Sequence, residues 1–175
     1  ISALIVKKTF WLGTDKFGRD FLSRLMAGSL VSFSVGFIAV AISLLLGILL
    51  GALAGYLGGT TDAIVSWFLN VTWAIPTLLL VMAITLLFGK GFWQVFVAVG
   101  CSMWVEVARM VRGQFLSLRE KEYVMAAKLM GFSNTRIITR HLLPNAWGPI
   151  IVMAASNFAN AILLVTFAHR AQLTG

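Results

Sequence analysis

Charged residues are scarce in this chain of 175 residues, because Asp, Glu, Lys and Arg together make up only 11% of it. A soluble domain normally carries about 25% charged residues. Hydrophobic residues account for 59% of the chain, and its mean hydropathy is +0.93. A soluble chain of this size would have more apolar surface than its core could bury. The composition therefore predicts a polytopic membrane protein rather than a soluble domain.

Reactive side chains are also few. The single cysteine, Cys101, excludes a disulfide framework and a thiolate metal site, and we interpret it as a small packing residue. Six acidic residues and two histidines leave too few intramembrane groups for an acid/base pair or a metal centre. No Gly-rich phosphate loop with a Lys is present either. We therefore expect no catalytic residue, no metal and no bound cofactor, and no ATP hydrolysis by the chain itself.

Long gaps between charged residues mark the expected membrane spans. Asp, Glu, Lys and Arg are missing from residues 25–61, 63–89, 91–105 and 142–168. A helix needs about 20 mainly apolar residues to cross the hydrocarbon. The third gap reaches that length only if its helix continues past Glu106 to about Arg112. The gaps predict four helical spans, near 31–57, 62–88, 92–114 and 145–167.

The net charge of +8 comes from basic residues that lie in loops between the apolar runs, where membrane proteins place them. We therefore expect membrane lipid, and no nucleic acid, as a partner. Five Lys and Arg lie within residues 7–24 and seven within 109–140. Three spans separate the two groups, so they face opposite sides. The positive-inside rule favours a cytoplasmic 109–140, an extracytoplasmic or interfacial segment 1–28, and a transmembrane domain over 29–175.

Small residues recur every fourth position along the first span. The five are Ala39, Ser43, Gly47, Gly51 and Gly55. This spacing places them on one helical stripe, where another helix can approach closely. The stripe predicts either ordinary packing inside the bundle or a subunit interface that slides during a conformational change.

Polar and helix-breaking residues interrupt two of the spans. Pro76 falls within the second span and predicts a kink, which beside Asn70 either shapes a pathway or is inert structure. In the third span Glu106, Arg109 and Arg112 share one face. Intramembrane charge is often functional. We interpret these three as interfacial anchors, with a Glu106–Arg109 pair, in preference to a gate.

The loop 117–144 carries the strongest pattern. A short helix over 118–130 would place Tyr123, Ala126, Ala127 and Met130 on one apolar stripe among charged residues. Two adjacent alanines let a partner surface come close. We expect Gly131 to end this helix, as a glycine does when it adopts a positive φ. The loop is therefore either a hairpin on the membrane surface or a docking element for a soluble partner.

A second short helix is expected after Gly131, capped by Ser133 or Asn134. Its periodicity gives it two faces: Ile137, Ile138, His141 and Leu142 on one, and Arg136, Thr139 and Arg140 on the other. Pro144 would then lie near the first turn of the fourth span.

A family resemblance appears in two stretches of this loop, EYVMAAKLMG at 122–131 and RHLLPN at 140–145. Together they are similar to the EAA loop of bacterial ABC-type import permeases, in the dipeptide, oligopeptide and nickel branch. Further matching stretches follow in order at 12–20, 23–25, 55–62, 76–80 and 108–113. Three departures stand out: Met125 opens the EAA triplet, and Trp67 and Asn70 occupy positions where the branch usually has Arg and Asp. Residues 165–170 also leave the pattern.

The resemblance implies an all-α membrane helix bundle of the ABC importer permease type, with about four of an expected six spans present. It implies a multi-pass subunit of the bacterial cytoplasmic (inner) membrane that translocates di- or oligopeptides by alternating access. Its partners would be a second homologous permease, an extracytoplasmic solute-binding protein and two ATPase subunits that bind ATP and Mg. The expected ATPase-coupling residues are Glu122, Tyr123, Ala126, Ala127, Met130, Gly131, Arg140, His141 and Pro144.

Two alternatives remain open. A nickel-importing permease of the same branch shares these motifs. A membrane scaffold whose loop merely recruits a soluble protein would also satisfy the residue pattern.

Overall fold

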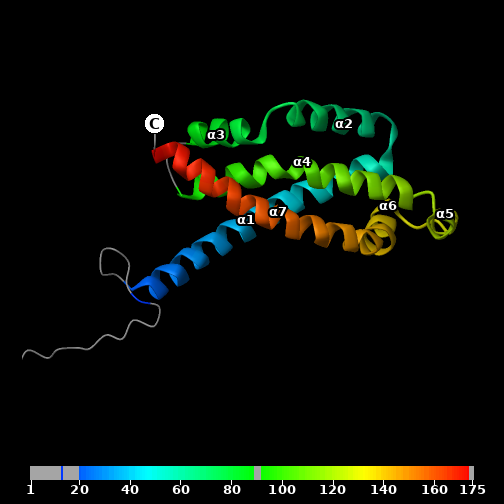
Figure 1. Ribbon diagram of the computed structural model, residues 1–175. Coiled ribbons are helices and arrows are strands. Elements are labelled where there is room, and N and C mark those ends of the chain that lie inside the picture. The colour runs from blue at the N-terminus through cyan, green and yellow to red at the C-terminus, as the bar shows by residue number, and fades with distance from the viewer. Residues whose placement is uncertain (1–12, 14–19, 89–91, 174–175) are drawn as a thin grey trace, which may run out of the picture. The chain divides into compact units, whose positions relative to one another are not determined.

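The computed structural model describes residues 13, 20–88 and 92–173, apart from the side chains of 31, 92, 93, 95 and 165–173. Its contacts divide the chain into two units, residues 1–34 and 35–175, each described by itself. The expected extracytoplasmic segment 1–28 lies mostly outside the described residues. The elements are all helical (Figure 1): α1 Phe21–Leu57, α2 Gly59–Trp73, α3 Thr77–Phe88, α4 Phe92–Leu118, α5 Glu122–Leu129, α6 Asn134–Ile137, the π-helical turn η1 Ile138–Leu142 and α7 Leu143–Leu173.

The described part of the first unit is the start of α1. Asp20 caps it, since its carboxylate accepts bonds from the Leu22 backbone N–H at 3.2 Å and from Ser23 Oγ at 2.5 Å. Large apolar side chains on the turns that follow are exposed: Phe21, Leu25, Met26, Leu30 and Phe33. Such a surface suits hydrocarbon better than water.

In the second unit, α4 contacts α2, α3 and α7 (Figure 1). One core cluster is built along α4 by Val107, Val111 and Phe115, which pack with Ala52 of α1 and Ile150 of α7. Many large apolar side chains of this unit point outward instead, among them those of α3 and the outer face of α1. This arrangement is expected when lipid surrounds the helices.

The second expected span is broken rather than kinked, which corrects the prediction of one helix over 62–88. Helices α2 and α3 meet at an angle of 91° across residues 74–76. Pro76 has no N–H to donate and disfavours helical geometry at Ile75. The end of α2 is closed by the Ala74 N–H, which donates to Asn70 O at 3.1 Å, and by the Ile75 N–H, which donates to Thr72 O at 3.3 Å.

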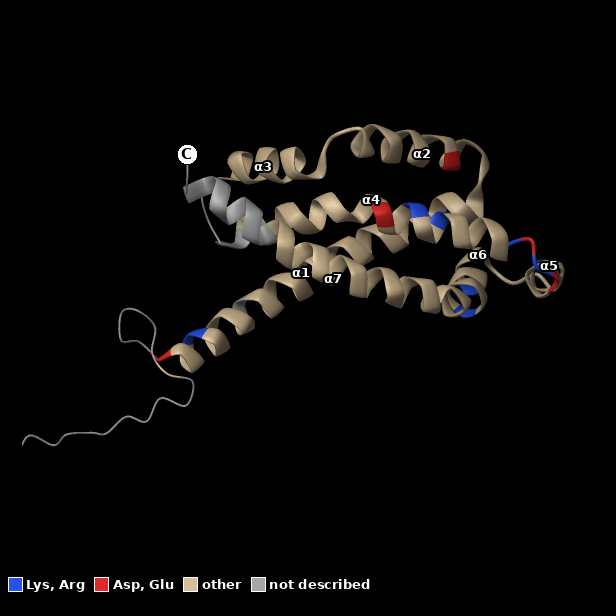
Figure 2. Cartoon of the chain, in the orientation of Figure 1, with Lys and Arg blue, Asp and Glu red and all other residues tan. Residues whose placement is uncertain are grey.

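Within the described residues, two helical segments are long and apolar enough to cross a membrane, Phe21–Leu57 and Asn134–Leu164. The bent pair α2–α3 gives a third if it counts as one span. Helix α4 is not among them, because its hydropathy is lowered by the charged residues in its second half. Among the described residues of the second unit, charged side chains gather toward the end that holds α5 and α6, and α3 carries none (Figure 2). The four spans therefore remain a prediction.

The second loop helix continues into the last long helix, where the sequence suggested two separate elements. Helix α6 passes through η1 into α7 in one unbroken helical run. Pro144, the second residue of α7, cannot donate a backbone bond to the preceding turn, and the π-helical turn accommodates that gap. Asn145 Nδ2 donates to His141 O at 2.6 Å and satisfies a carbonyl at this junction. The loop is thus mechanically continuous with α7.

Candidate functional site

The ends of α5 and α6 form as their sequence predicts. Gly131 has φ of +76°, and the Phe132 N–H donates to Ala127 O at 3.1 Å, which closes α5 in a tight left-handed turn. Ser133 caps α6, since its Oγ accepts a bond from the Arg136 N–H at 3.4 Å. The expected positive φ at Gly131 and the Ser133 cap are therefore confirmed.

The inner face of α5 packs against its own chain. Val124 and Ala127 are buried, and Ala127 is only 1% exposed. They join Phe115 of α4, Ile137 of α6 and Leu142 of η1 in one apolar cluster. This corrects the expectation that Ala127 lies on an exposed docking surface. Of the predicted stripe, Ala127 is buried in the core, whereas Ala126 and Met130 are exposed. Val124 and Ala127 therefore anchor α5 in this cluster.

The outer face of α5 is apolar and exposed. Leu129 is 90% exposed and Met130 65%, and Met125 and Ala126 are exposed beside them. We call these four residues the α5 patch. Exposed apolar groups among charges are typical of surfaces that contact a partner. The sequence prediction named Ala126 and Met130 but missed the i,i+4 pair of Met125 and Leu129.

The remaining predicted loop residues differ in exposure. Tyr123 is 40% exposed, and Glu122, in the first turn of α5, is exposed. His141 is half-buried, with its ring 6.1 Å from that of Phe132 and 6.5 Å from that of Tyr123. Its Nε2 has no hydrogen-bond partner among the residues that the structure describes. Arg140 of η1 is exposed, as its place on the predicted polar face requires, and Pro144 in the first turn of α7 is exposed as well.

Three contacts join the loop to the end of α1. Tyr56, which is buried, donates its hydroxyl to Asn134 Oδ1 at 2.9 Å. Lys128 Nζ lies 5.3 Å from the centroid of the Tyr56 ring. Arg119 Nη1 donates to Gly55 O at 3.2 Å. Tyr56 could not be predicted from neighbouring residues, because its partner Asn134 lies 78 positions away. These contacts therefore connect the loop directly to α1.

The small-residue stripe of α1 packs on α4 of the same chain. A Cβ added at Gly47 would lie 2.5 Å from Val107 Cβ, and one at Gly51 would lie 2.5 Å from Ala108 O. At Gly55 it would meet Phe115 Cβ at 2.6 Å. Ala39 and Ser43 are also fully buried. The structure therefore supports the first of the two interpretations, in which the stripe packs inside the bundle of its own chain.

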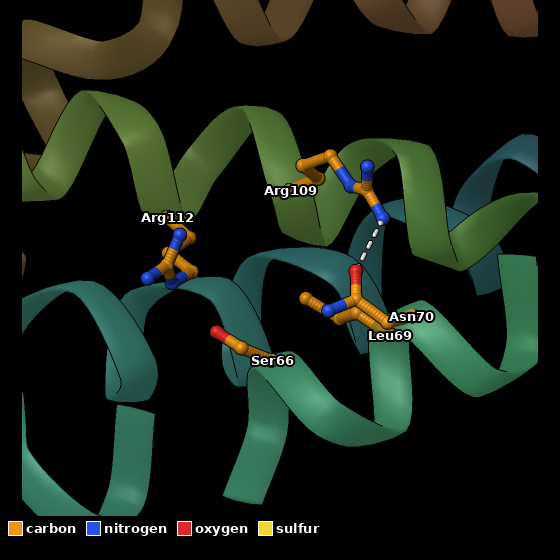
Figure 3. A pocket seen from close by; sticks show the side chains of 5 residues that line it. All are labelled: Ser66, Leu69, Asn70, Arg109 and Arg112. Atoms are coloured by element: carbon orange, nitrogen blue, oxygen red, sulfur yellow. Dashed lines mark hydrogen bonds between the residues drawn. The ribbon is translucent and has the colours of Figure 1, made fainter. Parts of the chain in front are cut away.

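Between α2 and α4 lies a polar pocket of about 280 Å³, lined by Ser66, Leu69, Asn70, Arg109 and Arg112 (Figure 3). Arg109 Nη2 donates to Asn70 Oδ1 at 3.1 Å, and its guanidinium lies 3.5 Å from the centroid of the Trp73 ring. Arg112 forms an ion pair with Asp62, in which Nη2 donates to Oδ2 at 2.7 Å. The two arginines therefore fasten α2 to α4.

Asp62 lies in the first turn of α2. The helix begins at Gly59, and its cap residue is Gly58. Gly58 has φ of +69° and Gly59 +54°, a reversal that leaves Asp62 inside the first turn. There its negative charge stabilises the N-terminus of the helix, and its carboxylate forms the ion pair with Arg112.

Asn70→Asp is expected to stabilise the α2–α4 contact, because a carboxylate would replace the neutral amide that Arg109 now uses. We expect the free energy of unfolding to rise by about 1 kcal/mol, the usual limit for a partly exposed pair. Thermal unfolding of the purified protein in detergent measures it. Asn70→Leu, which removes the acceptor, should lower the midpoint. A lower midpoint for Asn70→Asp would contradict the expected ion pair with Arg109.

The long apolar helices and the exposed apolar side chains define a helical membrane protein. A family model described as "Binding-protein-dependent transport system inner membrane component" matches residues 47–169. This match covers most of the chain, and the chain belongs to that family. It is therefore an inner-membrane component.

Curated relatives agree with this family. The oligopeptide transport system permease protein OppC of Bacillus subtilis is 36% identical over 160 residues, which are 91% of this chain and 52% of that protein. The dipeptide transport system permease protein DppC of Alkalihalophilus pseudofirmus is 42% identical over 153 residues, 87% of this chain and 50% of that protein. OppC of Escherichia coli K12 is 42% identical over 166 residues, which are 95% of this chain and 55% of that protein. The chain spans about half the length of these relatives.

A solved structure shares the fold. It is described as "Crystal structure of an amino acid ABC transporter with histidines" and superposes with a TM-score of 0.60 at 18% sequence identity. The match covers 88% of this chain and 77% of that one. The all-α fold of the ABC importer permease type is therefore confirmed.

Proposed function

We propose that this chain forms part of the membrane channel of an ATP-driven importer of di- or oligopeptides. The observation that carries the proposal is the similarity, at 36–42% identity over about nine tenths of the chain, to permeases of dipeptide and oligopeptide transport systems. The nickel alternative shares the loop motifs, but the relatives compared above are peptide permeases. The exposed α5 patch supports a partner outside the hydrocarbon.

The proposed partners follow from the family of the chain, from its lack of an ATP-binding motif and from its exposed α5 patch. Its family name places it in a system that uses a solute-binding protein. No Gly-rich phosphate loop with a Lys occurs in its sequence, so the energy comes from separate ATPase subunits that bind ATP and Mg. The α5 patch is the proposed seat for one ATPase, with Glu122, Tyr123 and His141 around it. A second, homologous permease completes the channel and carries the matching seat.

The contacts of the loop suggest how ATPase closure moves the spans. When the ATPase shifts α5, the bond between Tyr56 and Asn134 and the bond from Arg119 to Gly55 O pull on α1. The unbroken run from α6 through η1 transfers the same displacement to α7. Packed helices move as rigid bodies rather than deform continuously. Tilting of α1 and α7 against α4 would open the pathway to alternate sides.

Reconstitution of the complete transporter tests this function. Proteoliposomes that contain both permeases and the ATPases, supplied with the binding protein and labelled peptide, should accumulate peptide only when ATP is present. Omission of this chain should abolish uptake. Nickel accumulation without peptide accumulation would replace the substrate assignment. ATPase recruitment without uptake of either solute would favour the scaffold interpretation.

A further inference from the structure

A second cavity of about 280 Å³ opens between α3, α4 and α7, away from the α2–α4 pocket. Its wall combines apolar side chains with three neutral polar ones and a single carboxylate. The lining residues are Thr77, Ser102, Met103, Glu106, Asn160, Leu163 and Leu164. Ligand sites in proteins have this composition, a mostly apolar concave surface with a few convergent polar groups.

Glu106 lies deep in the proposed membrane span. It is the fifteenth of the 27 residues of α4, so at 1.5 Å per residue it is roughly 20 Å from either end of the helix. In a membrane-spanning α4 this position lies within the hydrocarbon, in place of the interfacial one expected from the sequence. A carboxylate at such depth is unfavourable unless it lines a water-filled pathway or pairs with a cation.

The neighbouring arginine does not supply that cation. Arg109 turns toward α2, where it bonds Asn70 and lies over the Trp73 ring. Among the described residues no Lys, Arg or His forms an ion pair with Glu106, so the expected Glu106–Arg109 pair is wrong. The carboxylate is exposed to the cavity instead.

The polar groups of the cavity match a primary ammonium group. An ammonium has three N–H donors and no acceptor. Glu106 offers carboxylate oxygens, and Thr77 and Asn160 offer one side-chain oxygen each. Ser102 Oγ already donates its proton to Val99 O at 2.8 Å, so it faces a ligand as an acceptor. A metal ion fits less well, because the described residues contain no group of three His, Cys, Asp or Glu.

We propose that this cavity receives the amino-terminal ammonium group of the peptide in transit, with Glu106 as its counter-charge. The inference rests on the proposed peptide transport, since every unmodified peptide carries this group whatever its sequence. The volume of the cavity is near the lower limit for a ligand site, so it holds one end of a peptide rather than the whole peptide. Met103, Leu163 and Leu164 then contact the first side chain of the peptide.

A charge series at Glu106 in the complete reconstituted transporter tests the proposal. At a fixed concentration of peptide-loaded binding protein, Glu106→Gln should lower the initial uptake rate about tenfold, as loss of a charge-assisted bond predicts. Glu106→Asp should retain most of the rate, and Glu106→Lys should fall below Glu106→Gln. On α7, Asn160→Ala should lower uptake severalfold, whereas Ser156→Ala, one turn away and outside the cavity, should not.

Other results of the charge series would contradict either this inference or the proposed function. Equal uptake by the wild type, Glu106→Gln and Glu106→Lys transporters would overturn the inference while leaving peptide transport intact. Loss of the second permease from the purified Glu106→Gln complex would also overturn it, because Glu106 would then pair with a cation of that subunit. A wild-type transporter that moves no peptide would instead contradict the proposed function. The affinity of the binding protein for peptide, measured separately, should be the same throughout.

Discussion

Gly51→Leu should abolish most of the assembled transporter. A Cβ at this position would lie 2.5 Å from the Ala108 carbonyl oxygen and 2.9 Å from Val111 Cβ, and a Leu adds three further carbon atoms. The nearest obstacle is helix backbone, which cannot rotate away as a side chain can. Overpacking normally lowers the free energy of unfolding by about 1–3 kcal/mol, and we expect this site at the upper limit or beyond it.

The measurement is the yield of complex that co-purifies with the ATPase after expression at matched levels. Gly51→Ala should give an intermediate yield, because even one carbon atom must displace α4. Leu49→Phe is the matched control, since Leu49 of the same helix is exposed and away from the stripe. Leu50 serves less well, because it packs on the cluster of Leu69 and Trp104. Equal yields for Gly51→Leu and Leu49→Phe would show that α1 and α4 separate easily.

The features that sequence predicted well are local and periodic. The stripe at Gly47, Gly51 and Gly55 follows from a spacing of four on a helix, and it does face another helix. Gly131 could be read from the end of an apolar stripe, and Ser133 from its place before the next helix. Such signals depend on a few neighbouring residues, so they survive without knowledge of the fold.

The features that sequence missed depend on distant partners. Pro76 indicated a disturbance, but nothing nearby told a mild kink from the 91° break. Glu106 and Arg109 have the spacing of a helical pair, yet Arg109 is drawn away by Asn70, which lies 39 positions earlier. Which partner Arg109 bonds depends on which helices pack together. A periodic pattern in the sequence does not contain that information.

Helix α5 illustrates the same limit within eight residues. Both of its faces are apolar, so periodicity alone does not tell which one is buried. Phe115 and Ile137 decide it by covering Val124 and Ala127. Ala127, which the sequence offered as the docking residue, is therefore internal, and Leu129 is the most exposed large apolar residue of the loop.

Leu129→Glu should uncouple the ATPase without unfolding the loop. The side chain is 90% exposed, so a carboxylate there remains hydrated in the isolated permease and disturbs no internal packing. In the complex it would have to be buried against the partner, where a lost apolar anchor amounts to about 2 kcal/mol, roughly thirtyfold in affinity. ATPase co-purification and peptide-stimulated hydrolysis should both fall, while membrane insertion and the thermal midpoint of the permease stay unchanged.

Ala127→Glu provides the contrast that makes this result specific. Its new carboxylate would enter the cluster around Phe115 without a partner, so this variant should lower the thermal midpoint of the permease itself. Loss of ATPase binding in Ala127→Glu would therefore report damage to the loop, whereas the same loss in Leu129→Glu reports the contact. Lys121→Glu, an exposed charge change at the cap of α5, controls for the added negative charge. Normal ATPase binding and normal coupling in Leu129→Glu would remove the α5 patch from the interface, because no apolar anchor at the centre of a contact tolerates a buried carboxylate.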